Sequence, residues 1–149
     1  MLHPRSESKL AGVDDRLRQL VTEAATTCPF DLLVTDGRRS RARQAQLVAA
    51  GASQTMDSAH ITGEAIDVAA VVGKSVRYDW PLYYIMADHM REAAVKLGIR
   101  IRWGGCWDRD LSASGDDAEQ MVAGYVARRK AVGKKAFLDG PHLELFDRT

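Results

Sequence analysis

The stretch Ser58-Ala59-His60-Ile61-Thr62-Gly63-Glu64-Ala65-Ile66-Asp67 decides how this chain places its chemistry on a fold. It leads into an apolar run, and residues 64–72 are predicted to form a strand. Because side chains alternate along a strand, Ala65, Asp67 and Ala69 share one face. A carboxylate therefore stands on a surface of small residues, with room above it for another group.

Two histidines can approach that carboxylate. His60 comes just before the strand, and Gly63 allows the connecting loop to bend sharply. His142 lies near the end of the chain, in residues 141–146, which we expect to form the final strand. If the two strands are neighbours in one sheet, His142 meets His60 and Asp67.

Two neutral imidazoles and one carboxylate suit zinc, and a catalytic zinc usually keeps three protein ligands and one water. His60, Asp67 and His142 are therefore candidate ligands for one Zn²⁺ ion, and the alternative is that these side chains are structural or merely exposed. Asp139, three residues before His142, is placed to accept a proton from that water and to pass it to a leaving amine. Glu144 shares a strand face with His142 and is a candidate to orient its imidazole.

The rest of the chain mixes helices with short, non-adjacent strands, which favours an α+β fold with a small antiparallel sheet flanked by helices. Further strands are predicted at residues 31–35 and 99–103, and helices at residues 13–24, 40–50, 79–97 and 117–131. In the helix over residues 79–97, the face expected to be buried carries Ile85, Met86, Met90, Ala93 and Leu97. We interpret residues 1–149 as one domain, with a loose N-terminal arm at residues 1–12 and an inserted loop and helix at residues 108–135.

Composition and charge argue against several classes of function. The formal net charge of +1 gives no strong attraction to nucleic acid or anionic lipid, although basic clusters occur at residues 38–43 and 128–135. A nucleic-acid binder would instead show salt-sensitive DNA binding without zinc. No apolar run is long enough to span a bilayer, and the polar start of the chain lacks the pattern of a secretory signal. Cys28 and Cys106 form no CxxC pair, and we expect reduced thiols rather than a disulfide.

At these residues the chain resembles the VanY-type zinc D-Ala-D-Ala carboxypeptidases and L-Ala-D-Glu endopeptidases, which share a fold with the hedgehog signalling domain. The S-x-H-x-x-G-x-A-x-D pattern of that family is matched without a gap at residues 58–67, and a late D-x-x-H-x-E element at residues 139–144. A G-x-R-S element followed by Gln and Leu is matched at residues 37–47, and a W-G-G-x-W element at residues 103–107. The resemblance covers about residues 31–146 and is closest to the compact phage endolysins.

The resemblance implies a role for each matching residue. The implied zinc ligands are His60, Asp67 and His142. Asp139 becomes the general base and acid of the reaction. Arg39 falls where relatives place an arginine that steadies the substrate carbonyl and its developing negative charge, with Arg38 as the alternative bearer of that role.

Two features depart from the family pattern. Cys106 stands where many relatives carry an acidic or polar residue, either as a substrate contact or as a bystander thiol. Residues 108–135 look expanded, and they form either a lid over the site or a plain helical decoration.

The resemblance implies a zinc-dependent peptidoglycan hydrolase that cuts the stem peptide at the L-alanyl-D-glutamate bond, as a phage endolysin does in host cell lysis. Two alternatives stay open: a D,D-carboxypeptidase that removes terminal D-alanine, and a non-catalytic zinc-binding module. The expected partner is the stem peptide, with no nucleic acid, no stable membrane insertion and a monomeric chain. Without a signal peptide, we expect synthesis in the host cytoplasm and action on the cell wall after release.

Overall fold

The sheet joins segments that lie far apart in the chain. The computed structural model describes residues 1–148, and within them the strand order is β1-β2-β5-β4, with β3 paired to β2. The strands are β1 (Asp31–Asp36), β2 (Ala65–Val72), β3 (Ser75–Arg77), β4 (Ile101–Trp103) and β5 (His142–Leu145). The pairings between them are antiparallel. The α+β class and the antiparallel sheet predicted from the sequence are therefore confirmed, whereas β3 was not predicted.

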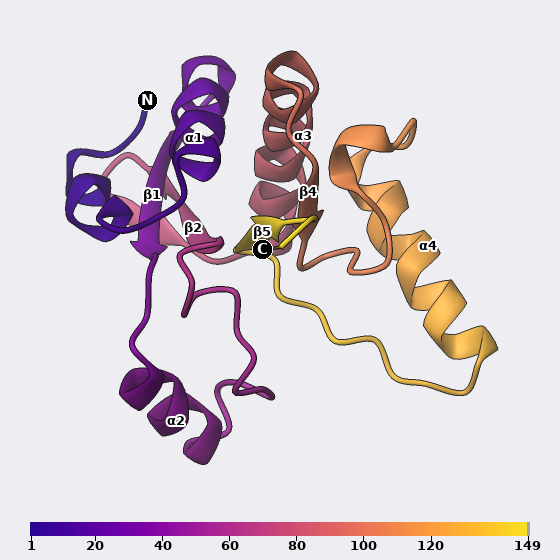
Figure 1. The fold of residues 1–149 in the computed structure, drawn as a ribbon. Helices are drawn as coiled ribbons and strands as arrows, with labels where there is room; N and C mark the ends of the chain where they lie inside the picture. The colour runs from indigo at the N-terminus through magenta and orange to yellow at the C-terminus, as the bar shows by residue number, and fades with distance from the viewer. Residues whose placement is uncertain (149) are drawn as a thin grey trace.

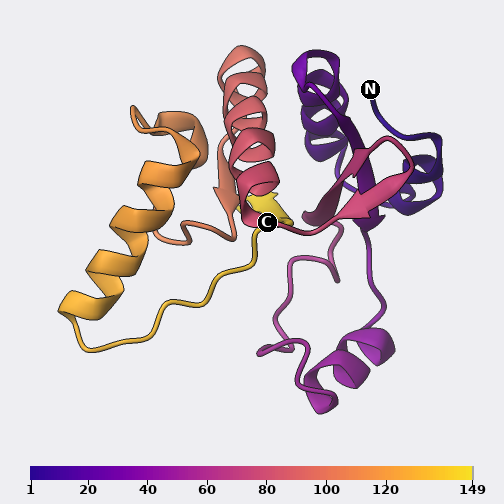
Figure 2. The ribbon, with the colours of Figure 1, turned by 180° about the vertical axis from the view of Figure 1, so that it is seen from behind.

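The helices lie on both sides of this sheet. They are α1 (Asp15–Thr27), α2 (Arg41–Ala49), α3 (Trp80–Leu97) and α4 (Ala118–Ala131), with short 3-10 helices η1 (Pro4–Leu10) and η2 (Leu111–Ala113). α1 and α3 stand side by side over one face of the sheet, whereas α2 lies on the opposite side (Figures 1 and 2). α4 packs beside α3 at the β4 end of the molecule. Of the helices in the described residues, none is both long and apolar enough to cross a bilayer.

The core lies between the sheet and the pair α1 and α3. In α3 the buried side chains follow the helical period and are Tyr83, Met86, Ala87, Met90, Ala93 and Ala94. The predicted burial of Ile85 and Leu97 is wrong, because these side chains are 38% and 36% exposed. Ile85 lies on the side of the helix opposite this stripe, and Leu97 is the last residue of the helix.

The expected loose arm at residues 1–12 is instead an ordered segment along the free edge of β1. Its first residues exchange main-chain hydrogen bonds of 2.8 and 3.0 Å with Leu32. The Ser6 hydroxyl accepts a hydrogen bond of 2.9 Å from the Val34 N–H, and Ser6 is fully buried. Leu10 is also buried in the core. The sequence pattern missed this segment because it is short and polar, yet the unpaired edge of a strand needs hydrogen-bond partners.

Replacing Ser6 tests this docked segment. Ser6→Ala leaves the buried Val34 N–H without its acceptor, so we expect the free energy of unfolding to fall by about 1–3 kcal/mol in urea denaturation. The control is Ser8→Ala in the same 3-10 helix, whose hydroxyl is exposed; it should change stability by less than about 0.5 kcal/mol. Equal, small effects of the two variants would mean that the segment is not docked.

The turn after β4 touches the segment that leads into β5. The main chains of Gly104 and Asp139 are hydrogen-bonded, with the Asp139 N–H donating to the Gly104 carbonyl at 2.9 Å. The Gly104 N–H donates in turn to the His142 carbonyl at 2.9 Å. A Cβ atom on Gly104 would lie 2.0 Å from the Asp139 carbonyl oxygen, so only glycine allows this approach. Trp103, beside it, donates from its indole N–H to the Gly140 carbonyl at 2.8 Å and fixes the same turn.

Gly104→Ala should push the turn at residues 139–142 away from the sheet. Because the clash is with main-chain atoms, we expect a loss of about 1–3 kcal/mol in unfolding free energy, measured by urea denaturation. Gly115→Ala is the matched control, since nothing lies within 4 Å of its added Cβ. If Gly104→Ala is as stable as Gly115→Ala, the close approach does not exist in solution.

Candidate active site

Three polar side chains stand in one row across the sheet. Asp67 of β2 is paired with His142 of β5 on one side and with Asp36 of β1 on the other. The register of β1 shifts between Val34 and Asp36, and this bulge sets Asp36 rather than Thr35 opposite Asp67. The neighbours of Asp67 along β2 are core residues. Because side chains alternate along a strand, the side chains of the row point to the face of the sheet away from α1 and α3.

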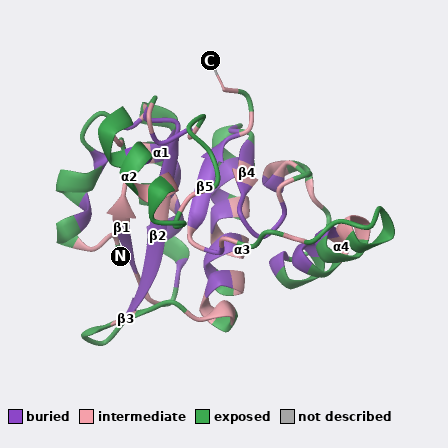
Figure 3. Cartoon of the chain, turned by 90° about the horizontal axis from the view of Figure 1, so that it is seen from below, coloured by how far each residue is buried: buried purple, intermediate pink, exposed green. Residues whose placement is uncertain are grey.

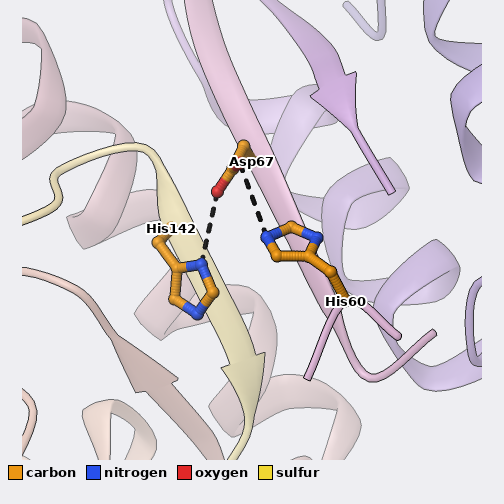
Figure 4. A group of neighbouring side chains, drawn as sticks. All are labelled: His60, Asp67 and His142. Atoms are coloured by element: carbon orange, nitrogen blue, oxygen red, sulfur yellow. Dashed lines mark hydrogen bonds and ion pairs between the residues drawn. The ribbon is translucent and has the colours of Figure 1, made fainter. Parts of the chain in front are cut away.

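His60 reaches this row from the loop before β2, as Figure 4 shows. Its Nε2 atom lies 3.5 Å from Asp67 Oδ2, and His142 Nδ1 lies 3.3 Å from Asp67 Oδ1. The loop bends at Gly63, which has φ of +77° and whose added Cβ would lie 2.3 Å from the Gly12 carbonyl oxygen. The bend predicted at Gly63 and the meeting of the two histidines with Asp67 are both present.

The outer nitrogen of each imidazole is already bound to an acceptor. His60 Nδ1 donates to the Gly37 carbonyl at 2.7 Å, because a carbonyl oxygen can only accept. His142 Nε2 lies 2.8 Å from Glu144 Oε1 and donates to it in the same way. The inner nitrogens, His60 Nε2 and His142 Nδ1, therefore both face the Asp67 carboxylate. A positive charge, carried by a proton or a metal ion, belongs between them.

The arrangement fits a small metal ion. The ligand atoms of His60, Asp67 and His142 all lie within 4.8 Å of one another. Ligands about 2.0–2.1 Å from a tetrahedral zinc stand roughly 3.3 Å apart, close to the two His–Asp distances here. Metal-binding histidines commonly donate their second N–H to a carbonyl or a carboxylate, as both of these do. The three residues can hold a metal ion.

The charges of the group are coupled. Burial lowers the pKa of His142, but the Asp67 and Glu144 carboxylates outweigh it and raise that pKa to about 9. Burial acts on Asp67 in the opposite sense, and hydrogen bonding to His142 and His60 nevertheless holds its pKa well below the usual range. A metal ion bound at this point would take the place of a proton between His142 and Asp67.

A second row of polar residues supports His142. Glu144, which the sequence placed on the same strand face, is opposite Arg102 of β4, and Arg102 Nη1 donates to Glu144 Oε2 at 3.4 Å. Burial raises the pKa of Glu144, but the hydrogen bond to His142 and the charge of that ring outweigh burial and hold the pKa below its ordinary value. The guanidinium of Arg102 also lies 4.5 Å from the centre of the Phe146 ring. Arg102 thus holds the acceptor that orients His142, a support that its place in the sequence did not reveal.

Arg39 lies at the other end of the row. Its guanidinium donates to the Asp36 carboxylate and, at 2.6 Å, to Gln44 Oε1. It also lies 3.8 Å from Asp67 Oδ2. The side chain is only 9% exposed. Sequence reasoning missed Asp36, which ends β1 and holds this guanidinium beside Asp67.

Arg38, the alternative bearer of the oxyanion role, points elsewhere. Its side chain packs against Gly12, whose added Cβ would lie 2.9 Å from the Arg38 Cδ atom. It lines a separate surface pocket, not the cavity that contains the histidines. Arg39 is therefore the arginine of the 38–39 pair that faces the site.

The row forms the floor of a cavity of about 690 Å³. One wall is α2 with residues 52–59, and the opposite wall carries Trp107, Tyr125 and Phe137. Trp107 stacks on Phe137 and lies 5.1 Å from the His142 ring, measured between ring centres. Figure 3 shows that α2 and much of α4 are exposed, while β2 and β5 between them are buried. The predicted helix at residues 117–131 is confirmed as α4, and Tyr125 brings it to the cavity wall.

Asp139 also lines this cavity. Burial, and then the nearby Asp67 carboxylate, raise the pKa of Asp139 above its ordinary value. A carboxylate with a raised pKa is better suited to take up and release a proton near neutral pH. The turn at Gly104 fixes its main chain next to that of His142.

The cysteines lie outside this group. Cys28 and Cys106 are both free and buried, as expected for reduced thiols. Burial, followed by the neighbouring Asp108, raises the pKa of Cys106 to about 11, so the thiol stays protonated. Cys106 does not line the cavity above His142, and contacts Asp108 and Arg128 instead. This placement favours the bystander interpretation of Cys106.

Comparison with known proteins agrees with the geometry. Residues 1–146 match the profile of a family described as phage L-alanyl-D-glutamate peptidase. The chain is 31% identical over 144 residues to the L-alanyl-D-glutamate peptidase of Escherichia phage T5. This alignment covers 94% of this chain and 93% of that relative. It is 36% identical over 79 residues to the L-alanyl-D-glutamate peptidase of Listeria phage A118, covering 52% of this chain and 27% of that longer protein.

A solved structure of an L-Ala D-Glu endopeptidase is also similar to this chain. The crystal structure of the Serratia marcescens L-Ala D-Glu endopeptidase ChiX matches with a TM-score of 0.71 and 33% sequence identity, over 95% of this chain and 86% of that one. The resemblance recognised from the sequence motifs is thereby confirmed. Since the family match covers nearly the whole sequence, this chain belongs to the phage L-alanyl-D-glutamate peptidase family.

Proposed function

We propose that this protein hydrolyses the stem peptide of peptidoglycan at the bond between L-alanine and D-glutamate. The observation that carries the proposal is the convergence of His60, Asp67 and His142 on the floor of a cavity that Asp139 also lines. Relatives named for cleavage of this bond support the choice of substrate. The protein is a peptidase that acts on the cell wall, and we propose that it reaches the wall from the host cytoplasm after release, as a monomer.

His60, Asp67 and His142 hold one zinc ion in this proposal, because two imidazoles and a carboxylate are a donor set that zinc favours. When bound, zinc polarises the scissile carbonyl and lowers the pKa of water. Glu144 and the Gly37 carbonyl keep the two imidazoles turned inward.

The remaining residues of the site move the proton and steady the charge. Asp139 accepts the proton of the attacking water and returns it to the departing D-glutamyl amine. Arg39, fixed by Asp36 and Gln44, sets a positive charge beside the scissile carbonyl oxygen as negative charge develops there. Because these partners hold Arg39 in place before the substrate arrives, little reorganisation is needed during the reaction.

The test is mass spectrometry of purified sacculi after digestion with the zinc-loaded protein. We expect new termini at L-alanine and D-glutamate, and His60→Gln should abolish them together with the bound zinc. The matched control is His89→Gln, because His89 lies in α3 and contacts Thr27 rather than the site. It should retain both cleavage and one zinc per chain.

Other outcomes separate the alternatives. Release of terminal D-alanine alone would make the protein a D,D-carboxypeptidase. Zinc binding without any product from several wall types would favour a non-catalytic module. Cleavage that survives complete chelation would overturn the role of the metal.

Asp139→Asn tests the proton carrier separately. The amide keeps the shape of the side chain but cannot take a proton, so the rate of cleavage should fall by about 10²–10⁴-fold while zinc stays bound. Kinetics on a defined stem peptide and metal analysis measure the two effects. Asp147→Asn is the control, since its carboxylate is exposed and pairs with Arg100. Loss of zinc from Asp139→Asn would give Asp139 a structural role instead.

A further inference from the structure

The substrate of the proposed reaction brings its own negative charge to the cavity. Glutamate has two carboxyl groups, and a linear peptide needs only one of them to continue. The other carboxyl of the D-glutamyl residue is therefore left either as a free anion or as an amide, a few bonds from the scissile nitrogen. An anion there must be accommodated in a cavity that already contains many carboxylates.

Most charges of the cavity are already paired. Among the described lining residues the acids are Asp36, Asp57, Asp67, Asp139 and Glu144. Asp36 holds Arg39, and Asp57 accepts a hydrogen bond of 3.3 Å from Arg148. The lining arginines in the described part of the chain are Arg39 and Arg43. Arg39 is held by Asp36 and Gln44 beside Asp67, where the proposed reaction uses it at the scissile carbonyl oxygen, so Arg43 is the arginine left for a second anionic group of the substrate.

Arg43 stands in the first turn of α2, on the wall of the cavity. Its main-chain N–H donates to the Ser40 hydroxyl at 3.0 Å, which fixes the start of the helix. Its guanidinium donates to Gln46 Oε1 at 3.3 Å, a neutral acceptor one helical turn away. Within the described residues it forms a salt bridge with no carboxylate of the protein, unlike Arg39. A guanidinium that has no carboxylate partner in the protein can bind a carboxylate of the substrate through two parallel N–H donors.

We infer that Arg43 binds the free carboxylate of the D-glutamyl residue and makes the enzyme prefer stem peptides in which this group is not amidated. The inference rests on the proposed function, because it assumes that the D-glutamyl residue occupies this cavity. An amide in place of the carboxylate removes the charge and one acceptor oxygen, so it forms a weaker contact with a guanidinium.

The test uses two synthetic stem peptides that differ only in this group, one with the free carboxylate and one with the carboxamide. For the unmodified enzyme we expect kcat/KM to be about tenfold higher on the carboxylate peptide, the effect of one charge-assisted contact. Arg43→Gln should bring the ratio close to one by lowering kcat/KM on the carboxylate peptide alone. Arg43→Lys keeps the charge and should retain part of the preference.

Arg41→Gln is the matched control, because Arg41 lies on the same helix but lines a separate pocket. It should leave the ratio unchanged. If Arg43→Gln keeps the preference, or slows both peptides equally, the inference is wrong while the proposed function stands. If the zinc-loaded unmodified enzyme cleaves neither peptide, the proposed function is overturned, and this inference with it.

Discussion

The pairing of Asp67 in β2 with His142 in β5 is the contact on which the rest of the site depends. It brings together residues 75 positions apart in the chain, and their side chains meet at 3.3 Å. A shift of one residue in this register would turn one of the two toward α1 and α3, because side chains alternate along a strand. The apolar neighbours of Asp67 prevent that shift, since Ile66 and Val68 would then leave the core. The hydrophobic core thus sets the geometry of the polar site on the other face.

Around that pair, each functional side chain has a partner that limits its freedom. Glu144 holds His142, Arg102 holds Glu144, and Gln44 and Asp36 hold Arg39. Gln44 also donates to the Thr55 carbonyl at 2.6 Å and so connects Arg39 to the loop that forms the cavity wall. Such support makes a site more precise, since reacting groups then lose little freedom when the substrate binds.

Much of the site could be predicted from the sequence because its residues come in short, dense segments. His60, Gly63 and Asp67 lie within eight positions, so a bend at Gly63 and a strand through Asp67 can be predicted together from this one segment. The partners of those residues could not be predicted in the same way. Asp36 acts where it does because a bulge shifts the register of β1, and Arg102 because β4 lies beside β5. Both depend on strand order, which no local pattern records. The N-terminal arm was misjudged for a related reason, since its partners lie on the edge of β1.

The distance along the chain between His60 and Asp67 on one side and His142 on the other has a consequence for how the site forms. His60 lies just before β2, Asp67 lies in β2 and His142 lies in β5, so the three side chains meet only when β5 is paired with β2. Contacts of such long sequence separation raise the contact order of a fold, and proteins of high contact order fold more slowly. A chain in which β5 is not paired with β2 therefore lacks the group of side chains that could hold a metal ion.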